Sequence, residues 1–271
     1  MRLCLLAGIA LIATPVAAPA QTAQEAPLVA AAQARGQLMF AYDRAAWLGT
    51  DAFLKQVQDP GERVAGYIVD GPAASPRLTF YDKDAANPQA VYVARFDGGK
   101  LVEERMLGEG DDRTLDATQR RMIDARARAA AHLAREGAKP CAPKSFNSVV
   151  VPPATADAPI DVYLLTPQTT VENLPFGGHY RVTVTADGET RSRAFTQSCI
   201  ELPRTPPADP QGRKPVGAFF NHIMDPVPTE LHVFSSLYML TPLMVATRQP
   251  GVRVWPIVQG RIRPPADGSR R

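Results

Sequence analysis

The chain changes character near Gly137, and this change most constrains its fold. Before Gly137, two long segments, residues 27–47 and 116–136, repeat their apolar residues at helical spacing. After it, short β-type runs alternate with proline-rich connections. The pattern predicts an α+β fold. A helix-plus-antiparallel-sheet half covers residues 21–140, and a mostly-β half, for which a sandwich-like packing is one arrangement, covers residues 141–271.

Along the sequence, the first half is expected to contain helices before and after the strands of a small antiparallel sheet. Residues 27–47 form the first helix, and Thr50 is placed to cap a separate helix over residues 51–58. Strand-like runs follow at residues 63–70, 77–82 and 89–107, the last with the hairpin signal Asp97-Gly98-Gly99. A helix over residues 116–136 closes this half, with its apolar residues on one narrow stripe.

The second half is expected to consist of strands joined by irregular connections. The expected strands cover residues 146–151, 160–165, 179–185, 189–195, 216–223, 230–238, 243–247 and 252–258. Residues 203–215 are too rich in proline for regular structure, so we expect them to form an exposed connection.

The hairpin over residues 180–194 can be assigned a register. A two-residue turn ending at Gly188 would place Arg191 and Arg193 among buried valines, and burying unpaired charge costs more than any turn preference. A three-residue loop ending at Gly188 avoids this cost. Arg181, Arg191 and Arg193 then share one face of the sheet. That face offers a surface for an acidic glycan, a lipid head group or a protein, although an ordinary solvated sheet face explains the same pattern.

The stretch VENLPFGGHYRVTVTADGE, residues 171–189, resembles the LPxGxYxVxV pattern of transthyretin-like and other immunoglobulin-like secreted modules. The paired Gly177 and Gly178 and the following His179 depart from that pattern. The resemblance implies a sandwich-like second half and carries no implication about activity.

The N-terminus, residues 1–20, has the features of a secretory signal peptide. Arg2 precedes a short apolar run, and a small-x-small pattern ending at Ala20 suits cleavage before Gln21. The run is short for a bilayer span and is broken by Pro15, which favours cleavage over a membrane anchor. The abundance of Ala, Arg and Pro suits a GC-rich bacterial genome. We therefore expect a periplasmic or secreted bacterial protein that is not an integral membrane protein after cleavage.

Charge and cysteine content fit that compartment. The chain has 30 Lys and Arg against 27 Asp and Glu, a net charge of +3 that includes Arg2. This near balance, together with export, argues against nucleic acid as a partner. Cleavage removes Cys4 and leaves Cys141 and Cys199. We expect these two to form a structural disulfide bond, because redox cysteine pairs are usually close in sequence.

The segment FFNHIMDPVPTELHVFSS, residues 219–236, holds the clearest candidates for a metal or catalytic site. His222, Asp225, Glu230 and His232 are chemically adequate ligands for zinc or another divalent ion. In a strand, Glu230 and His232 would share a face. The spacing matches no specific metal motif, however, and packing in the core of the second half explains the same histidines. Apolar residues at strand spacing accompany them: Phe219, Leu231, Val233 and Leu237.

The sequence contains no short catalytic signature such as G-x-S-x-G, H-E-x-x-H or a P-loop, and we expect no cofactor. Two functions remain open. The leading hypothesis is an exported envelope protein with a non-catalytic binding or scaffolding role, whose partner is an anionic envelope ligand or a protein. The alternative is a periplasmic hydrolase that uses a cluster of His222, Glu230 and His232, with or without a metal.

Expression of the full-length chain in a bacterial host should give a mature protein that begins at Gln21 and is found in the periplasmic or secreted fraction. The reason is the match of the N-terminus to a cleavable signal. Intact-mass spectrometry of the purified protein checks this. A membrane-bound chain that retains residues 1–20 would contradict it.

Overall fold

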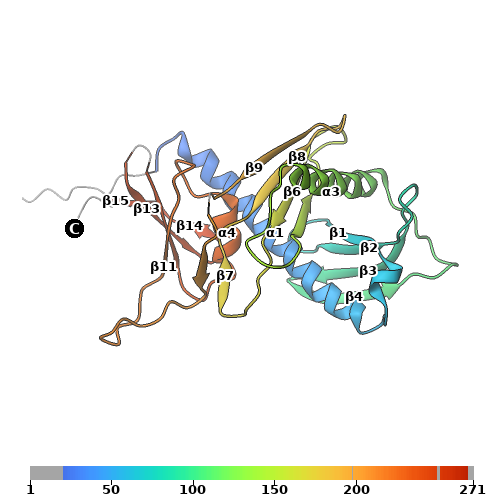
Figure 1. Ribbon diagram of the computed structural model, residues 1–271, viewed down its shortest axis with the longest axis horizontal. Coiled ribbons are helices and arrows are strands. Elements are labelled where there is room, and N and C mark those ends of the chain that lie inside the picture. The colour runs from blue at the N-terminus through green and yellow to red at the C-terminus, as the bar shows by residue number, and fades with distance from the viewer. Residues whose placement is uncertain (1–20, 197, 249–250, 268–271) are drawn as a thin grey trace, which may run out of the picture.

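The computed structural model describes residues 21–196, 198–248 and 251–267. The predicted signal peptide, residues 1–20, and residues 268–271 lie outside this range. The described part has the predicted α+β class, with one long helix followed by a mostly-β second half (Figure 1). None of the helices in these residues combines the length and the apolar character that crossing a bilayer requires.

The first sheet is the antiparallel one that the sequence predicts, with strand order β1-β2-β3-β4. A short helix, α2, precedes it. The bounds are α2 Pro60–Arg63, β1 Gly66–Asp70, β2 Arg77–Tyr81, β3 Ala90–Asp97 and β4 Lys100–Met106. The predicted hairpin joins β3 to β4 through Gly98 and Gly99, whose φ angles of 52° and 77° are open to glycine at no steric cost.

The second sheet is also antiparallel, in the order β5-β6-β8-β9. Its bounds are β5 Asn147–Val151, β6 Ile160–Leu165, β8 Tyr180–Val184 and β9 Thr190–Ala194. The register of the β8–β9 hairpin is the predicted one, because Val184 pairs with Thr190 and Gly188, at φ 87°, closes a three-residue loop. The valine face packs on helix α3, Ala117–Arg135, whose first turn is fixed by a capping box between Asp116 and Gln119.

The third sheet has strand order β11-β12-β13-β14. Strand β14 pairs with the C-terminal end of β13, and β15 pairs with its N-terminal end. A two-stranded ribbon of β7 and β10 lies beside this sheet in the second half. The bounds are β7 Asn173–Pro175, β10 Glu201–Pro203, β11 Ala218–Asn221, β12 Leu243–Thr247, β13 Arg253–Val258, β14 Arg261–Ile262 and β15 Ala266–Asp267. Strands β11 and β12 are parallel, and a parallel pair needs a crossover connection.

That crossover contains helix α4, Glu230–Ser236, where the sequence predicted a strand. The strand prediction was wrong because local hydrogen bonding favours a helix start. The backbone N–H of Thr229 donates to Nδ1 of His232 at 2.9 Å, as in one half of a capping box. Not all of the core residues predicted for this segment are buried. Leu231 and Val233 are buried and Leu237 is half-buried, whereas Phe219 is 52% exposed because its neighbour Phe220 takes the inward position of β11.

Helix α1, Glu25–Leu54, runs along the length of the molecule from the third sheet to the first (Figure 1). It is continuous, so the predicted break at Thr50 was wrong. Its buried residues recur every three or four positions and are mostly small: Glu25, Val29, Ala32, Gly36, Met39, Tyr42, Ala45, Ala46, Gly49, Ala52 and Phe53. Because this stripe continues past Thr50, core packing holds the helix together where the local sequence would allow it to end.

The two halves share their core. Met39 and Phe80 of the first half lie in one apolar cluster with Tyr163 and Phe234 of the second. The start of α1 is held to β13 by a buried, bidentate ion pair between Glu25 and Arg253, with N–O distances of 2.6 and 2.8 Å. The hydrogen bonds from Arg253 lower the pKa of Glu25, so the pair stays charged.

The predicted disulfide bond joins Cys141 to Cys199, with their Cα atoms 5.4 Å apart. It links the chain just before the second sheet to the chain just after it. The sequence separation of 58 residues corresponds to a loop-closure stabilisation of roughly 4 kcal/mol in the chain-entropy model.

Replacing Gly36 by alanine should lower the free energy of unfolding by about 1–3 kcal/mol, although alanine favours helices. A Cβ atom at Gly36 would lie 2.5 Å from the carbonyl oxygen of Glu230 and 2.6 Å from Cβ of Val233, so α4 would have to move. Gly61→Ala is the matched control, because a Cβ there meets nothing within 4 Å. Urea unfolding measures both, and equal stabilities for the two variants would contradict the prediction.

Candidate functional site

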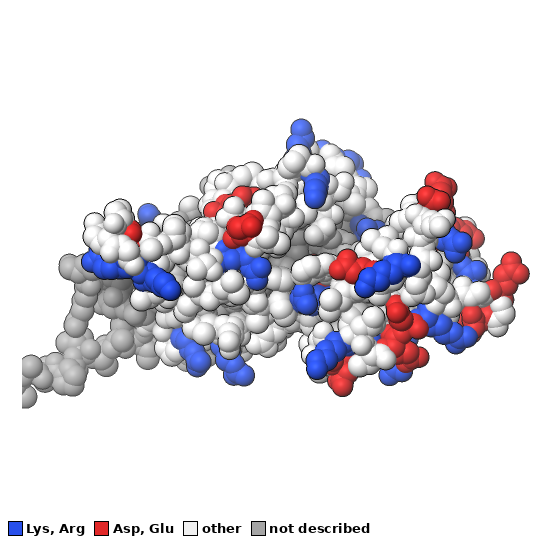
Figure 2. Space-filling model, turned by 90° about the horizontal axis from the view of Figure 1, so that it is seen from below, with Lys and Arg blue, Asp and Glu red and all other residues white. Residues whose placement is uncertain are grey.

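At the end of the molecule that carries the first sheet, the surface charges do not by themselves mark a partner site. Figure 2 shows acidic and basic side chains interspersed over the end of the molecule that carries the first sheet. Pairs such as Arg95 and Glu103, 3.2 Å apart and mostly exposed, account for this mixture. A surface of alternating sign gives no long-range attraction to a charged partner.

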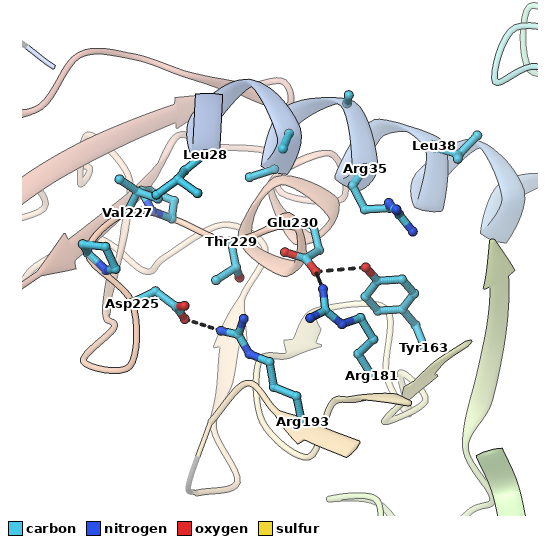
Figure 3. Close-up of a pocket in the computed structure, with 15 residues that line it drawn as sticks. Leu28, Arg35, Leu38, Tyr163, Arg181, Arg193, Asp225, Val227, Thr229 and Glu230 are labelled. Carbon is cyan, nitrogen blue, oxygen red and sulfur yellow. Dashed lines mark hydrogen bonds and ion pairs between the residues drawn. The ribbon is translucent and has the colours of Figure 1, made fainter. Parts of the chain in front are cut away.

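A cavity of about 520 Å³ lies between α1, the second sheet and the loop before α4 (Figure 3). One wall is polar and comes from the sheet, the loop and α4: Tyr163, Arg181, Arg193, Asp225 and Glu230. The opposite wall is largely apolar and comes from α1 and the loop: Leu28, Ala31, Leu38, Val227 and two prolines. Arg35 adds a third guanidinium from α1. The cavity thus brings together residues from both of the predicted sites.

Arg181, Glu230 and Tyr163 form the centre of the polar wall. The Nη1 atom of Arg181 donates to Oε1 of Glu230 at 3.1 Å, and the Tyr163 hydroxyl donates to the same oxygen at 2.9 Å. Burial, together with the charge of Glu230, raises the pKa of Tyr163, so this hydroxyl remains a donor. The Nε atom of Arg181 has no hydrogen-bond partner among the described residues and lies 4.0 Å from Asp161. The protein therefore leaves part of this guanidinium unsatisfied.

Asp225 connects the predicted histidine cluster to the predicted basic face. Its Oδ2 atom contacts the guanidinium of Arg193 and lies 2.7 Å from Nε2 of His222. Burial by itself would raise the pKa of Asp225, but the hydrogen bond from His222 and the charge of Arg193 outweigh it and lower that pKa. Asp225 is therefore an ionised carboxylate held on two sides.

The basic face needs these carboxylates. Arg181 and Arg193 are directly opposite each other on β8 and β9, a like-charge pairing that destabilises a sheet. Glu230 and Asp225 each neutralise one of them, so the arginines can stay side by side at the cavity. Arg191, the third predicted member, is exposed and does not line this cavity.

The four predicted ligands do not converge on one point. The rings of His222 and His232 are edge-to-face, 4.6 Å between centroids, but the carboxylate of Glu230 faces Arg181. The predicted shared face of Glu230 and His232 is absent because this segment is a helix. Within the three described ranges, no group of three or more His, Cys, Asp or Glu side chains is arranged to hold a metal ion.

Two histidines act as neutral hydrogen-bonding groups of the core. Nδ1 of His232 accepts from Thr229, and Nδ1 of His179 accepts from the backbone N–H of Thr166 at 3.0 Å while its Nε2 lies 2.9 Å from the carbonyl oxygen of Pro175. Burial lowers the pKa of His179 to about 4 and that of His232 well below its ordinary value. Both rings are therefore uncharged at neutral pH.

Sequence reasoning missed Arg35, Asp161 and Tyr163. Arg35 donates to Asp161 at 3.1 Å, and Asp161 also accepts from Thr183 at 2.7 Å. A signal was present in IDVYLL, where Asp161 and Tyr163 occupy alternate positions of an otherwise apolar strand and therefore share a face. Arg35 carried no comparable signal.

Comparison of the chain with protein-family models, with curated proteins and with solved structures gave no match. The arrangement of the side chains is therefore the basis for a functional proposal.

Unfolding free energy should fall as the pH is lowered from about 6.5 towards 4. In this range the unfolded chain protonates His179 and His232 while the folded chain does not, so the stability present above pH 6.5 is lost. Each histidine contributes a slope of at most about 1.4 kcal/mol per pH unit. His232→Gln keeps an acceptor at the capping position and should make the slope shallower, at a cost of about 1 kcal/mol at pH 7.

Urea unfolding at pH 7, 6 and 5 measures these slopes. Val233→Ala is the matched control on the same helix, because it removes buried methyl groups without a titrating one. It should cost on the order of 2–4 kcal/mol at every pH and leave the slope unchanged. An unchanged slope in His232→Gln would show that this histidine titrates in the folded protein.

Proposed function

We propose that the chain is an exported bacterial envelope protein, periplasmic or secreted, that binds a small anionic amphiphile without chemically changing it. The observation that carries the proposal is the meeting of Arg35, Arg181 and Arg193, from three different elements, at one cavity with an apolar opposite wall. A ligand with an acidic head and a hydrocarbon segment is complementary to both walls.

The arginines keep donors available for a ligand. Each is oriented by one carboxylate, namely Asp161 for Arg35, Glu230 for Arg181 and Asp225 for Arg193. A guanidinium has five N–H donors, so one carboxylate partner does not saturate it. The charges of the three arginines and of their three carboxylate partners cancel. The cavity would therefore select a ligand head group by its acceptor geometry more than by net charge.

The apolar wall favours a ligand with hydrocarbon over a bare inorganic anion. Leu28 is 50% exposed at the cavity, and Leu38 and Val227 extend the same wall. Covering such surface stabilises a complex by about 25 cal/mol for each Å² removed from water.

The hydrolase alternative has less support from this geometry. A general base must come within hydrogen-bond reach of the substrate, but the side chain of His222 is only 1% exposed. Nδ1 of His232 already accepts a hydrogen bond from the backbone N–H of Thr229 at the start of α4. The His222–Asp225 pair is the feature that favours the alternative, and it lies behind the cavity wall that Asp225 forms.

Isothermal titration of the mature protein with dodecyl phosphate and with dodecanoate, below their critical micelle concentrations, tests the proposal. Binding should be measurable for at least one of these, and dodecanol should bind at least about tenfold more weakly because it lacks the charge-assisted hydrogen bonds. Arg35→Gln and Arg193→Gln should each weaken binding by roughly tenfold, the value of one such bond.

Arg191→Gln is the matched control, because Arg191 lies on the same strand pair outside this cavity. It should bind the probes as the parent protein does. Thermal melting of each variant separates lost binding from lost folding. Equal affinities for the acids and dodecanol, or for the parent and Arg193→Gln, would reject the proposed site.

A further inference from the structure

A second cavity, of about 510 Å³, lies beside the C-terminal half of α1. It is bordered by α1, β1, the start of β5, the end of α4 and the loop over residues 168–171. The lining residues that matter for binding are Asp43, Trp47, Tyr67, Asn147, Gln168 and Tyr238. No residue of this second cavity lines the first one, which we call the arginine cavity after Arg35, Arg181 and Arg193, so the two cavities are distinct sites.

An exposed indole forms part of this second cavity. Trp47 is 55% exposed, whereas the chain's other tryptophan, Trp255, is fully buried. The guanidinium of Arg44 lies 4.7 Å from the centroid of the Trp47 ring, within cation–π distance. An exposed aromatic ring at the wall of a cavity is a stacking surface for a flat, apolar face of a ligand.

Polar groups around the indole have unused hydrogen-bonding capacity. The hydroxyl of Tyr238 donates to Oδ2 of Asp43 at 2.6 Å, which leaves Oδ1 free. Asn147 is exposed and Tyr67 is half-buried at this cavity, and their amide and hydroxyl groups can both donate and accept. The amide nitrogen of Gln168 donates to the carbonyl oxygen of Thr170 at 2.6 Å, which leaves its amide oxygen. The cavity therefore offers both donors and acceptors beside one aromatic ring.

We propose that this second cavity binds a neutral saccharide. A pyranose ring has an apolar face that stacks on an indole and hydroxyl groups that each donate and accept, which is the combination that Trp47, Asp43, Asn147 and Tyr67 present. Asp43 is the one carboxyl group of the lining, and burial raises its pKa; the lining itself contains no Lys or Arg, and the neighbouring Arg44 stacks on Trp47. A proline-rich peptide would use the aromatic residues but would leave most of these polar groups unpaired.

The site is suited to binding rather than hydrolysis. Glycoside hydrolases generally place two carboxyl groups on either side of the scissile bond. Here Asp43 has no second carboxylate beside it in the lining, and it is already hydrogen-bonded to Tyr238. Asp43 is thus an acceptor for sugar hydroxyls. The proposal is independent of the arginine cavity, because the two sites share no residue.

Titration of the mature protein with maltotriose, cellotriose and N,N′,N″-triacetylchitotriose tests the proposal. Tryptophan fluorescence reports binding at Trp47, because Trp255 is buried, and calorimetry measures the affinity. At least one trisaccharide should bind with a dissociation constant of about 1 mM or tighter. Trp47→Ala and Asp43→Asn should each weaken that binding by at least about tenfold, as measured by calorimetry.

Phe219→Ala is the matched control, because Phe219 is an aromatic residue exposed to a similar degree on β11, away from this cavity. It should bind the trisaccharide as the parent does, and thermal melting should show that all three variants are folded. The proposal is overturned if no trisaccharide binds at up to about 20 mM, if Trp47→Ala binds as the parent does, or if a proline decapeptide binds and the sugars do not.

Discussion

The close crossing of α1 and α4 at Gly36 is the contact on which the rest of the second half depends. With no Cβ atom at Gly36, the first turn of α4 lies directly against α1, with its Glu230 carbonyl where a side chain would otherwise be. This position delivers the Glu230 carboxylate to Arg181 and Tyr163 and the Val233 side chain to the core of the third sheet. A larger residue would separate these groups, because packed interiors accommodate even one extra methyl group poorly.

Much of the fold could be predicted because its signals are local. Short β-type runs located β6 and β12, and the cost of burying arginine determined the register of β8 and β9. The wrong strand prediction at α4 also came from relying on a local signal. A short segment with alternating apolar residues is ambiguous between strand and helix, and the hydrogen bond from Thr229 to His232 decides for the helix. A histidine in the third helical position is an unusual capping residue, so the usual Glu or Gln signal was missing.

The candidate site was less predictable because long-range contacts assemble it. Sequence reasoning named Arg181 and Arg193 as one feature and Asp225 and Glu230 as another, although they form two ion pairs across 49 and 32 residues. One inference was within reach. Two arginines directly opposite each other on neighbouring strands require nearby carboxylates, and the carboxylates between His222 and His232 were available. The position of Arg35 depends on how α1 crosses the sheet, which no local pattern specifies.

The position of the two cavities follows from the composition of α1. Just over half of its core-facing stripe is alanine and glycine, which lets the helix lie close to the sheets, while Leu28 and Trp47 remain exposed along its flanks. Leu28, Arg35 and Leu38 border the first cavity, and Asp43 and Trp47 border the second. Because one continuous helix carries both sets, their spacing along the molecule is fixed by the helical rise of about 1.5 Å per residue. The sheets and the loops then supply different chemistry at each place, with arginines opposite the leucines and amide and hydroxyl groups around the indole.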